Sequence, residues 1–478
     1  MFLINWGDIK GRIDPFYYKI DYRTLEEAVL KNTKYKLRDF ILYMAGGATP
    51  KKDQKEKYYA DKSGIPFVRV QNLTPEGLDL SECVFINEQT HNNMLSRSKV
   101  QGNDLLVKIT GVGRMAVSSV APQQFEGNIN QHMVLIRTKD RQTSELVAAY
   151  LNSDIGEKLA SRRSTGGTRP ALDYSALRSI PVIINADIVN VMECAYKQKR
   201  QKEQEAQLLL NNISDYIIGA LGIKLPLEAN QDLSNRIFYI HATDMLGGRF
   251  DPRKYSRKYK QLLDAIESAP YDRLMLKEMV LNDVSGDWGV DDTIEDPDLI
   301  SCLTIRGTEF DNKFNLDLDN NRTKFRKYSK ASFDKIALKE KDILIEKSGG
   351  SEDQPVGRVA FIEKDMLDKY SLAFSNFIHR IRIDENKAVP EYVFEYLRLM
   401  HNIKITEVMQ TQTNGIRNLI MQEYFGQTIL LPEPKKQEEI AIHAAQMRKR
   451  AFELQEEAEK IVLDAKAKVE KMLLGDEQ

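Results

Sequence analysis

The pentapeptide Gly11-Arg12-Ile13-Asp14-Pro15 recurs near the middle of the chain as Gly248-Arg249-Phe250-Asp251-Pro252. A short stretch of helical character follows each copy, at 22–30 and at 259–266. Three more matches follow in the same order: 104–107 with 342–345, 113–116 with 357–360, and 149–151 with 395–397. The separation between matched segments grows from 237 to about 246 residues, as small loop insertions would cause. This order predicts two copies of one domain, because internal repeats of this kind define an architecture.

Within each copy, short segments rich in β-branched residues and bounded by Gly, Asn or Pro predict strands. In the first copy these segments are 65–70, 104–109 and 132–137. Their counterparts in the second copy are 303–306, 342–346 and 377–383. We therefore expect an α+β fold, with two tandem domains that each contain a small mixed or antiparallel β-sheet and helices.

A long segment of helical periodicity closes each copy, with apolar residues at steps of three and four. At 1.5 Å per residue each helix is expected to be roughly 50 Å long. A single narrow apolar stripe does not stabilise an isolated helix in water, so we expect the two helices to pack as an antiparallel coiled coil. A hairpin that only caps its own domain is the alternative. The predicted packing residues are Ile188, Met192, Ala195, Leu210, Ile213, Ile217, Ile440, Ala444, Met447, Ala451, Leu454, Ala458 and Ile461.

Glycine and proline mark the boundaries between these parts. Gly219 and Gly222 end the first helical pattern and Pro226 follows, while Pro432 and Pro434 precede the second pattern. We therefore predict a first domain at 1–186, a central spacer helix at 187–222, a second domain at 223–434 and a C-terminal spacer helix at 435–475.

The composition is that of an ordinary globular protein: 42% of the 478 residues are hydrophobic and 29% are charged. No stretch approaches the ~18 uninterrupted apolar residues of a membrane helix, and the first residues lack the basic region and apolar core of a secretory signal. The three cysteines lie far apart, without metal-ligand spacing. We therefore expect a cytoplasmic protein without a disulfide framework and without membrane association.

The charge of the chain is unevenly distributed. Residues 1–225 carry 31 of the 69 Lys and Arg against 25 of the 70 Asp and Glu, a net charge of +6. The remaining residues carry 38 against 45, a net charge of −7. Neither half has the strong basic excess of a nonspecific nucleic-acid binder, so any DNA contact must depend on local patches.

The sequence contains no pattern for a catalytic centre. A phosphate-binding G-x-x-x-x-G-K-[ST] loop is absent, and the six histidines, His132 and His379 among them, are not at metal-ligand spacing. The tetrapeptide Asp14-Pro15-Phe16-Tyr17 is similar to the catalytic tetrapeptide of adenine methyltransferases, but it does not follow a hydrophobic strand. We predict a binding protein that is not an enzyme and that has no metal and no cofactor.

Polar loops at the ends of the predicted strands are suited to DNA. Arg and amide side chains can read base edges, and Lys beside main-chain amides can bind phosphate. Polar loops are common on all protein surfaces, so a single loop is weak evidence. The hypothesis of DNA binding depends on the recurrence of such loops in both copies. The candidate DNA-binding residues are Thr49, Lys51, Lys52, Arg69, Gln71, Asn72, Lys108, Thr110, Arg114, Asn130, Gln131, Arg163, Arg169, Trp288, Arg306, Arg322, Lys324, Lys327, Lys347, Arg358, Asn376 and Arg417.

Taken together, the duplication and two motifs resemble the specificity (S) subunits of type I restriction–modification systems. Gly46-Gly47-Ala48-Thr49-Pro50, followed by 65–68 and 104–106, resembles the start and middle of a target recognition domain. Ser285-Gly286-Asp287-Trp288-Gly289 resembles the alternative opening of such domains. The second copy lacks the Gly-Gly-x-Thr-Pro motif, so base contacts do not transfer to it from the first.

The resemblance implies a DNA sequence-specificity subunit that binds double-stranded DNA. Each domain would read one half of an asymmetric, split sequence, with the helices as a ruler. It also implies partners: methyltransferase subunits, two of them in the expected assembly, and in some systems nuclease and translocase subunits. The base to be modified would be flipped into the partner's pocket. The alternative is a coiled-coil scaffold protein that does not bind DNA.

Overall fold

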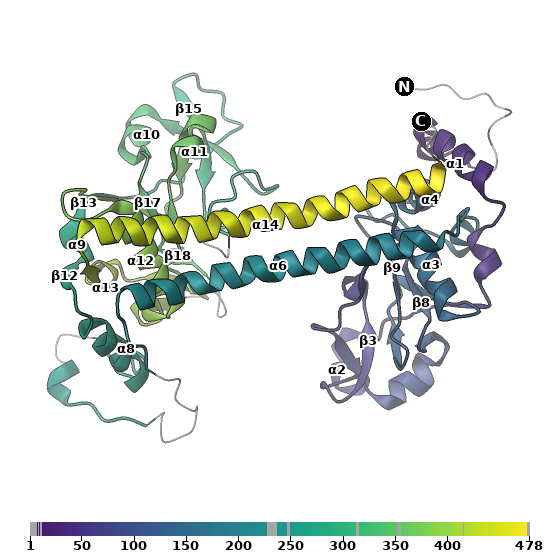
Figure 1. Ribbon diagram of the computed structural model, residues 1–478, viewed down its shortest axis with the longest axis horizontal. Coiled ribbons are helices and arrows are strands. Elements are labelled where there is room, and N and C mark those ends of the chain that lie inside the picture. Colours follow the sequence, from purple (N-terminus) through teal and green to yellow (C-terminus); the bar gives the residue numbers. More distant parts are fainter. Residues whose placement is uncertain are drawn as a thin grey trace. The chain divides into compact units, whose positions relative to one another are not determined.

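The computed structural model in Figure 1 describes residues 7, 9, 12–226, 237–245, 249–311, 315–350, 355–413 and 415–475. Gly11 and Gly248 of the repeated pentapeptide and the side chain of Lys52 lie outside the described residues. The chain divides into two compact units, Met1–Gln204 with Leu454–Gln478 (unit 1) and Glu205–Glu453 (unit 2). Both units combine helices with β-sheets, so the predicted α+β class is confirmed.

Unit 1 is built from short strands and helices, with 3-10 or π turns written η. In chain order its elements are η2 (Pro15–Tyr18), α1 (Ile20–Asn32), η3 (Leu37–Phe40), β1 (Tyr43–Gly46), η4 (Lys52–Gln54), α2 (Lys55–Tyr58), β2 (Tyr59–Ala60), β3 (Ile65–Val68), η5 (Val70–Asn72), β4 (Leu73–Thr74), β5 (Gly77–Leu78), β6 (Val84–Ile86), η6 (Thr90–Met94), η7 (Ser96–Ser98), β7 (Lys99–Val100), β8 (Leu105–Lys108), β9 (Ser118–Val120), β10 (Gly127–Ile129), β11 (Met133–Arg137), α3 (Arg141–Asn152), α4 (Asp154–Arg163) and α5 (Tyr174–Arg178).

Unit 2 has a similar content. Its elements are η8 (Ala242–Met245), α8 (Arg257–Glu267), β12 (Asp272–Met275), α9 (Leu276–Met279), β13 (Val280–Ser285), β14 (Val290–Asp291), β15 (Leu299–Ile305), β16 (Phe325–Ser329), α10 (Lys330–Ile336), β17 (Ile343–Glu346), β18 (Ser348–Gly349), β19 (Val359–Phe361), α11 (Lys364–Lys369), β20 (Leu372–Phe374), β21 (Ile378–Ile383), α12 (Pro390–Asn402), η9 (Ile405–Met409), β22 (Gln410–Thr413), β23 (Ile416–Leu419), α13 (Met421–Phe425) and β24 (Thr428–Leu431).

Each unit has the same central sheet of four antiparallel strands. The strand order is β1-β11-β8-β9 in unit 1 and β13-β21-β17-β19 in unit 2. A second sheet in each unit contains one parallel pair, β3 with β10 and β15 with β20. The strand order and the position of the parallel pair are therefore shared by the two units.

The start of β8 in unit 1 and the start of β17 in unit 2 are held by the same kind of ion pair. Asp104 accepts two hydrogen bonds of 2.8 Å from Arg137, and Asp342 accepts hydrogen bonds of 2.7 and 2.8 Å from Arg382. Each aspartate also accepts a hydrogen bond from the main-chain amide three residues earlier. Bidentate arginine–carboxylate pairs are among the stronger hydrogen bonds in proteins, so they fix this strand against its neighbour.

The repeated pentapeptide also makes the same contacts twice. Arg12 pairs with Asp14 at 2.8 Å, and Arg249 pairs with Asp251. The same guanidinium groups donate to main-chain carbonyls 151 and 161 residues further along the chain. The motif therefore anchors the start of each repeat to its own unit. These contacts give Asp14 a structural role and do not support a catalytic one.

One of the five sequence matches is out of register by three residues. The amide of Lys108 donates to Val117, and the amide of Glu346 donates to Arg358. The equivalent of Gly357 is therefore Ala116 rather than Gly113, and these two residues share a left-handed backbone, with φ of 102° and 55°. The sequence match aligned the two Gly-Arg dipeptides. The equivalent left-handed turn of unit 1 lies three residues later, at Ala116.

Two long helices, α6 (Ala186–Ala220) and α14 (Pro434–Leu474), contribute residues to both units. After α6, Gly222 takes a positive φ of 64°, and the amide of Ile223 donates to Ile218, which is the hydrogen bond of a Schellman C-cap. None of the thirteen predicted packing residues is exposed. No helix among the described residues is long and apolar enough to cross a membrane.

Helix packing is seen inside each unit separately. In unit 1, Ile188 of α6 shares a buried cluster with Val469 and Leu473 of α14. In unit 2, Ile213 and Ile217 of α6 share another with Ile440 and Ala444. The ion pairs Lys202–Glu457 and Lys199–Glu459 also join the two helices within unit 1.

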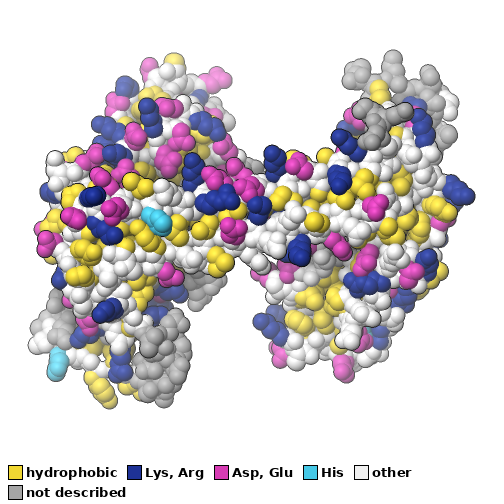
Figure 2. All heavy atoms as spheres, viewed as in Figure 1, with side chains coloured by type: hydrophobic (Ala, Val, Ile, Leu, Met, Phe, Trp, Pro, Cys, Tyr) yellow, Lys and Arg dark blue, Asp and Glu magenta, His cyan; other side chains and the backbone are white. Residues whose placement is uncertain are grey.

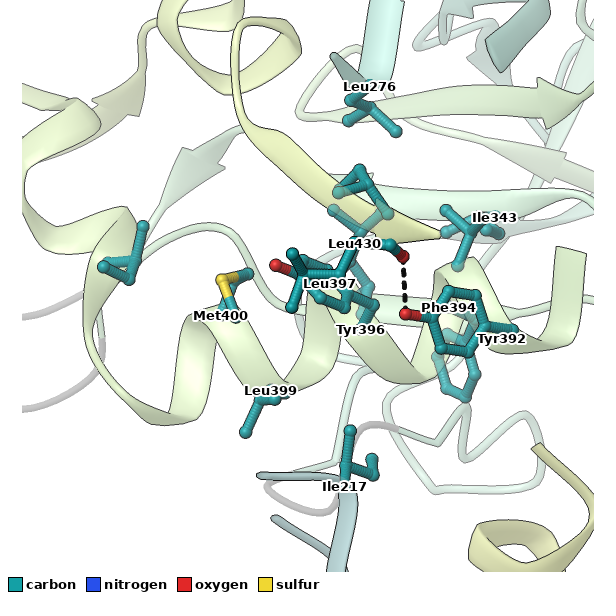
Figure 3. Close-up of a cluster of buried hydrophobic side chains, with 14 of the residues drawn as sticks. Ile217, Leu276, Ile343, Tyr392, Phe394, Tyr396, Leu397, Leu399, Met400 and Leu430 are labelled. Atoms are coloured by element: carbon teal, nitrogen blue, oxygen red, sulfur yellow. Dashed lines mark hydrogen bonds between the residues drawn. The ribbon is translucent and has the colours of Figure 1, made fainter. Parts of the chain in front are cut away.

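The core of unit 2 is centred on α12, as Figure 3 shows. Tyr392 and Tyr396 are fully buried, and the Tyr392 hydroxyl donates to the Leu430 carbonyl at 2.6 Å. Pro390 stands in the first turn of α12, where its missing N–H is not needed. In unit 1, Tyr150 of α3 is the buried counterpart of Tyr396. These helices cover the central sheet and leave its strand ends free to carry loops.

Candidate nucleic-acid interface

The strand order brings four loops of unit 1 to one edge of the central sheet. Because β11 is antiparallel to both β1 and β8, the ends of those strands lie beside its start. We define edge 1 as residues 47–51, 109–114, 130–132 and 165–171. Main-chain hydrogen bonds connect these loops: Gly47 donates to Met133 at 3.2 Å, Ile109 to His132 at 2.9 Å, and Gly111 to Pro170 at 3.1 Å.

Residue 47 at edge 1 has to be glycine, because there is no room for a side chain. A Cβ atom on this residue would lie 2.1 Å from the Ile129 carbonyl and 2.2 Å from the Asn130 carbonyl. The loop after β1 therefore lies directly on the loop before β11, and the Gln131 amide approaches Thr49 Oγ1 at 3.5 Å. This contact brings together two parts of the sequence that were predicted separately.

Edge 1 presents mainly polar side chains, together with the exposed apolar side chain of Val112. Gln131, Arg169 and Lys51 are exposed, and Thr49 and Thr110 are half-buried. Seven predicted residues therefore lie within edge 1: these five, and Arg114 and Asn130, whose side chains form hydrogen bonds within unit 1.

Lys108, at the end of β8, is buried beneath these loops. Its Nζ donates to the Val112 carbonyl at 2.7 Å, and burial lowers its pKa. A cationic group held by a neutral carbonyl next to the edge contributes positive potential there.

Unit 2 forms an equivalent edge from the same strand ends. We define edge 2 as residues 286–289, 347–350, 375–377 and 415–418. Gly286 donates to Ile378 at 3.1 Å, Lys347 to Phe377 at 2.9 Å, and Leu419 to Lys347 at 2.7 Å. A Cβ on Gly286 would lie 2.3 Å from two carbonyls, as at Gly47, so the openings of the two domains share one backbone geometry.

Four predicted residues lie at edge 2: Trp288, Lys347, Asn376 and Arg417. Lys347 Nζ donates to Ser285 Oγ at 2.6 Å, and burial lowers its pKa. Asn376 is exposed and occupies the position that Gln131 has at edge 1, since each precedes the residue whose carbonyl anchors the loop.

Several predicted DNA-binding residues instead hold the fold together. Arg163 is buried and pairs with Glu26 at 2.5 Å, and Arg358 is buried and pairs with Glu346 at 2.7 and 2.8 Å. Burial within an ion pair leaves no donor for DNA, so we withdraw both residues from the candidates. Arg306 and Arg114 are also engaged, with Glu309 and Asp154 respectively.

The predicted cluster at 69–72 is divided by the fold. The buried Asn72 caps a turn, accepting from the Arg69 amide at 2.9 Å and donating to the Asp79 carbonyl at 2.9 Å. Arg69 itself donates to the Glu82 carbonyl at 3.1 Å, whereas Gln71 is exposed. Asn130 is likewise buried, and it accepts from the His132 amide. Asn72 and Asn130 are therefore withdrawn as base-contacting residues.

The basic run in unit 2 does not lie at edge 2. Arg322 and Lys324 are exposed before β16, and Lys327 of β16 donates to the Ile294 carbonyl at 2.7 Å. Strand β16 belongs to the second sheet of unit 2. On the face drawn in Figure 2, basic and acidic side chains alternate, without a continuous basic surface.

Three residues at the edges were not among the predicted DNA-binding residues: His132, Phe377 and Ile416. Their positions depend on strand pairing and main-chain hydrogen bonds, which local sequence motifs do not predict. Among the described residues there is no group of three or more His, Cys, Asp or Glu side chains placed to hold a metal ion.

Comparison with known proteins supports the resemblance seen in the sequence. Residues 310–463 match the family model of the type I restriction modification DNA specificity domain. No curated protein sequence matches the chain significantly. The match to the family model confirms the predicted resemblance, and it covers much of unit 2 and part of α14.

Solved structures from type I systems are also similar. One, from a study of complex assembly and conformational transition of the type I system, has 12% identity and a TM-score of 0.50, covering 93% of this chain and 97% of that chain. The S subunit from M. genitalium has 11% identity, a TM-score of 0.41 and coverage of 92% and 94%. The HsdS subunit from Thermoanaerobacter tengcongensis has 13% identity, a TM-score of 0.37 and coverage of 93% and 96%. Because the identity is only 12%, the similarity to the first of these structures supports the fold and nothing further.

Proposed function

The chain carries a type I restriction–modification DNA specificity domain. From this premise we propose that it acts as the DNA sequence-specificity subunit of such a system. Units 1 and 2 are tandem target recognition domains, and each reads one half of a split site in double-stranded DNA through its edge. The observation that carries the proposal is the pair of edges: equivalent loops on equivalent sheets, with different side chains. Two unlike edges call for two unlike half-sites.

We assign the spacer role to α6 and α14. Their lengths of 35 and 41 residues correspond to roughly 52 and 62 Å. Their seam residues pack together inside each unit, which supports an antiparallel coiled coil. A spacer of about 50 Å is close to one and a half turns of B-DNA, at ~34–36 Å per turn.

The chain itself is proposed to be non-catalytic. Chemistry would come from methyltransferase subunits, two in the expected complex, and from nuclease or translocase subunits where the system contains them. This assembly would act in the cytoplasm, where its DNA substrate lies. A methyltransferase bound to the chain would flip the target base out of the duplex, since stacking blocks reaction inside it.

A mobility-shift measurement tests the function. We expect weak binding by the chain alone and specific binding with its methyltransferase, on duplexes taken from the methylated sites of the host genome. Retention on DNA should fall steeply with salt, because phosphate contacts release counterions. Salt-independent retention, or no specific binding with the methyltransferase present, would support a scaffold without DNA contact.

Paired insertions test the spacer. Seven residues inserted between Gln204 and Glu205 of α6 alone should abolish binding, because they shift one half of the helix seam against the other. Seven residues in α6 together with seven between Glu453 and Leu454 of α14 restore the seam. Because they add about 10 Å, we expect the tolerated gap to grow by roughly three base pairs. An unchanged gap preference in the double insertion would refute the spacer role.

A further inference from the structure

The two edges differ in chemistry at three equivalent positions. The main-chain hydrogen bonds from Ile109 to His132 and from Lys347 to Phe377 make His132 and Phe377 equivalent. A half-buried histidine at edge 1 is thus replaced by a phenylalanine whose exposed fraction is 43% at edge 2.

The second position lies after the glycine that opens each domain. Gly47 packs against the two main-chain carbonyls of Ile129 and Asn130 before β11, and Gly286 packs against those of Phe374 and Ser375 before β21. Thr49 and Trp288, each two residues after its glycine, are therefore equivalent. Trp288 is 40% exposed, and the Arg326 guanidinium lies 4.8 Å from its ring centre. A short hydroxyl side chain at edge 1 is thus replaced by an indole at edge 2.

The third position lies on the loop that closes each edge. The amide of Leu172 donates to Ile109 at 2.8 Å, and the amide of Leu419 donates to Lys347 at 2.7 Å. Counting back three residues from each leucine makes Arg169 and Ile416 equivalent. Both side chains are exposed, Ile416 by 45%.

Edge 2 therefore carries exposed apolar side chains on three separate loops, in a molecule whose edge 1 has polar residues at the same places. Exposed aromatic and aliphatic side chains are expensive to leave in water, and their concentration at one site marks a contact surface. In the major groove the apolar feature of a base pair is the C5-methyl group of thymine, and phenylalanine is one of the side chains that contact it.

We infer that unit 2 recognises thymine methyl groups in its half-site, with Phe377 as the main contact and Trp288 and Ile416 beside it. This inference rests on the proposed function of unit 2 as a DNA reader. Asn376 and Arg417, on the same loops, supply hydrogen bonds that orient the bases. Unit 1 has Thr49, His132 and Arg169 at the equivalent places, so at these places it contacts its half-site through polar side chains.

The geometry favours contact with methyl groups over insertion between base pairs. A wedge that unstacks DNA has to project from the surface. Phe377 has more than half of its surface covered, and its carbonyl accepts hydrogen bonds from the amides of Lys347 and Ser348 at 2.9 and 3.2 Å. The backbone that carries the ring is thus fixed, and the ring is only partly exposed.

Replacing thymine by uracil in the DNA removes one methyl group and leaves base pairing intact. The full chain in complex with its methyltransferase is titrated with duplexes in which all thymines of one half-site are replaced by uracil. We expect about fourfold weaker binding per contacted methyl group in the half-site read by unit 2, because burial of one methyl group is worth ~0.8 kcal/mol.

Phe377→Ala separates this contact from a general effect of uracil. The variant should bind the thymine duplex more weakly, and it should lose most of the difference between thymine and uracil in that half-site, because Phe377 is the main contact. Leu281→Ala, which removes a side chain that is 66% exposed at the opposite end of β13, should keep the full difference. Arg169→Ala should also keep it, since Arg169 belongs to edge 1.

The outcomes separate the two proposals. If the wild-type complex does not bind methylated-site duplexes specifically, the proposed function fails. If it binds but uracil has no effect in either half-site, or has the same effect on Phe377→Ala as on the wild type, the inference about thymine is overturned alone. A half-site of unit 2 without any A·T pair would also overturn it. Greater DNA bending that is lost in Phe377→Ala, without sensitivity to uracil, would favour a wedge and reject contact with methyl groups.

Discussion

Units 1 and 2 share a frame and differ where the central strand ends. Both begin their third strand with the same aspartate–arginine pair, Asp104–Arg137 and Asp342–Arg382. At the strand's last residue, Lys108 of unit 1 donates to a carbonyl, whereas Glu346 of unit 2 forms a buried ion pair with Arg358. The frame therefore persists, while the group at the strand's last residue changes from a lysine bound to a carbonyl to a glutamate–arginine ion pair.

The loops explain how the edges can vary without loss of the fold. The contacts that hold them are mostly main-chain hydrogen bonds, such as those from Ile109 to His132 and from Lys347 to Phe377. Any residue can provide these groups, so the side chains at edge 1 and edge 2 are free to differ. Only positions of close approach, such as Gly47 and Gly286, are restricted.

Breaking the buried pair of unit 2 should have the largest effect on stability. Glu346→Ala leaves Arg358 charged and buried, and we expect unit 2 to lose about 3–5 kcal/mol of unfolding free energy. Lys108→Ala, at the equivalent position of unit 1, should cost about 1 kcal/mol, because it removes one hydrogen bond.

Urea unfolding of unit 2 can be followed through Trp288 in a Trp6→Phe background, since these are the two tryptophans of the chain. The double variant Glu346→Met with Arg358→Met should recover most of the loss, because it leaves no unpaired charge. Equal losses for Glu346→Ala and Lys108→Ala would contradict the difference drawn here between the units.

The shared aspartates should both matter for stability. Asp104→Ala and Asp342→Ala each remove charge-assisted hydrogen bonds from an arginine and one from an amide, so each should cost at least about 2 kcal/mol in its own unit. Asp342→Ala should cost more, because it also removes the carboxylate that lies 3.9 Å from the buried Arg380. Hydrogen exchange of β8 and β17 measures the two units separately. A loss confined to one of the variants would show that the frame is not equivalent in both.

Acid should weaken unit 2 through His401. Burial lowers the pKa of His401 to about 4, against about 6.5 for an exposed histidine. Between these values the unfolded chain takes up a proton that the folded unit does not, so stability falls as pH falls from about 6.5 to about 4. The loss is at most ~1.4 kcal/mol per pH unit.

His401→Gln should flatten that part of the pH dependence, measured by the Trp288 signal. The wild type and the variant share all other titrating groups, so their difference isolates His401. Parallel pH profiles would contradict the assignment.

The smallest effect concerns salt. Arg169→Ala should reduce the slope of the logarithm of DNA affinity against the logarithm of salt concentration by about 1, if this exposed cation contacts a phosphate. Ile416→Ala, at the equivalent position of edge 2, should leave the slope unchanged. A mobility shift at several salt concentrations measures both, and equal slopes in the two variants would remove the predicted contrast.

Sequence patterns predicted the frame better than the edges. The duplication, the α+β class and the buried seam residues follow from periodicity and repeated motifs, which depend on local sequence. Whether Arg163 and Arg358 are presented or buried depends on Glu26 and Glu346, and Glu26 lies 137 residues from its partner. Phe377 and Ile416 were identified only by the main-chain hydrogen bonds, which show that they occupy in unit 2 the positions of His132 and Arg169 in unit 1.

The most direct measurement is methylation sequencing of the host genome with the wild-type gene and with two matched variants, Gln131→Ala at edge 1 and Asn376→Ala at edge 2. We predict a split, asymmetric methylated site in which each variant relaxes base identity in a different half. Relaxation of the same half by both variants, or an unsplit site, would contradict the reading of one half-site by each unit.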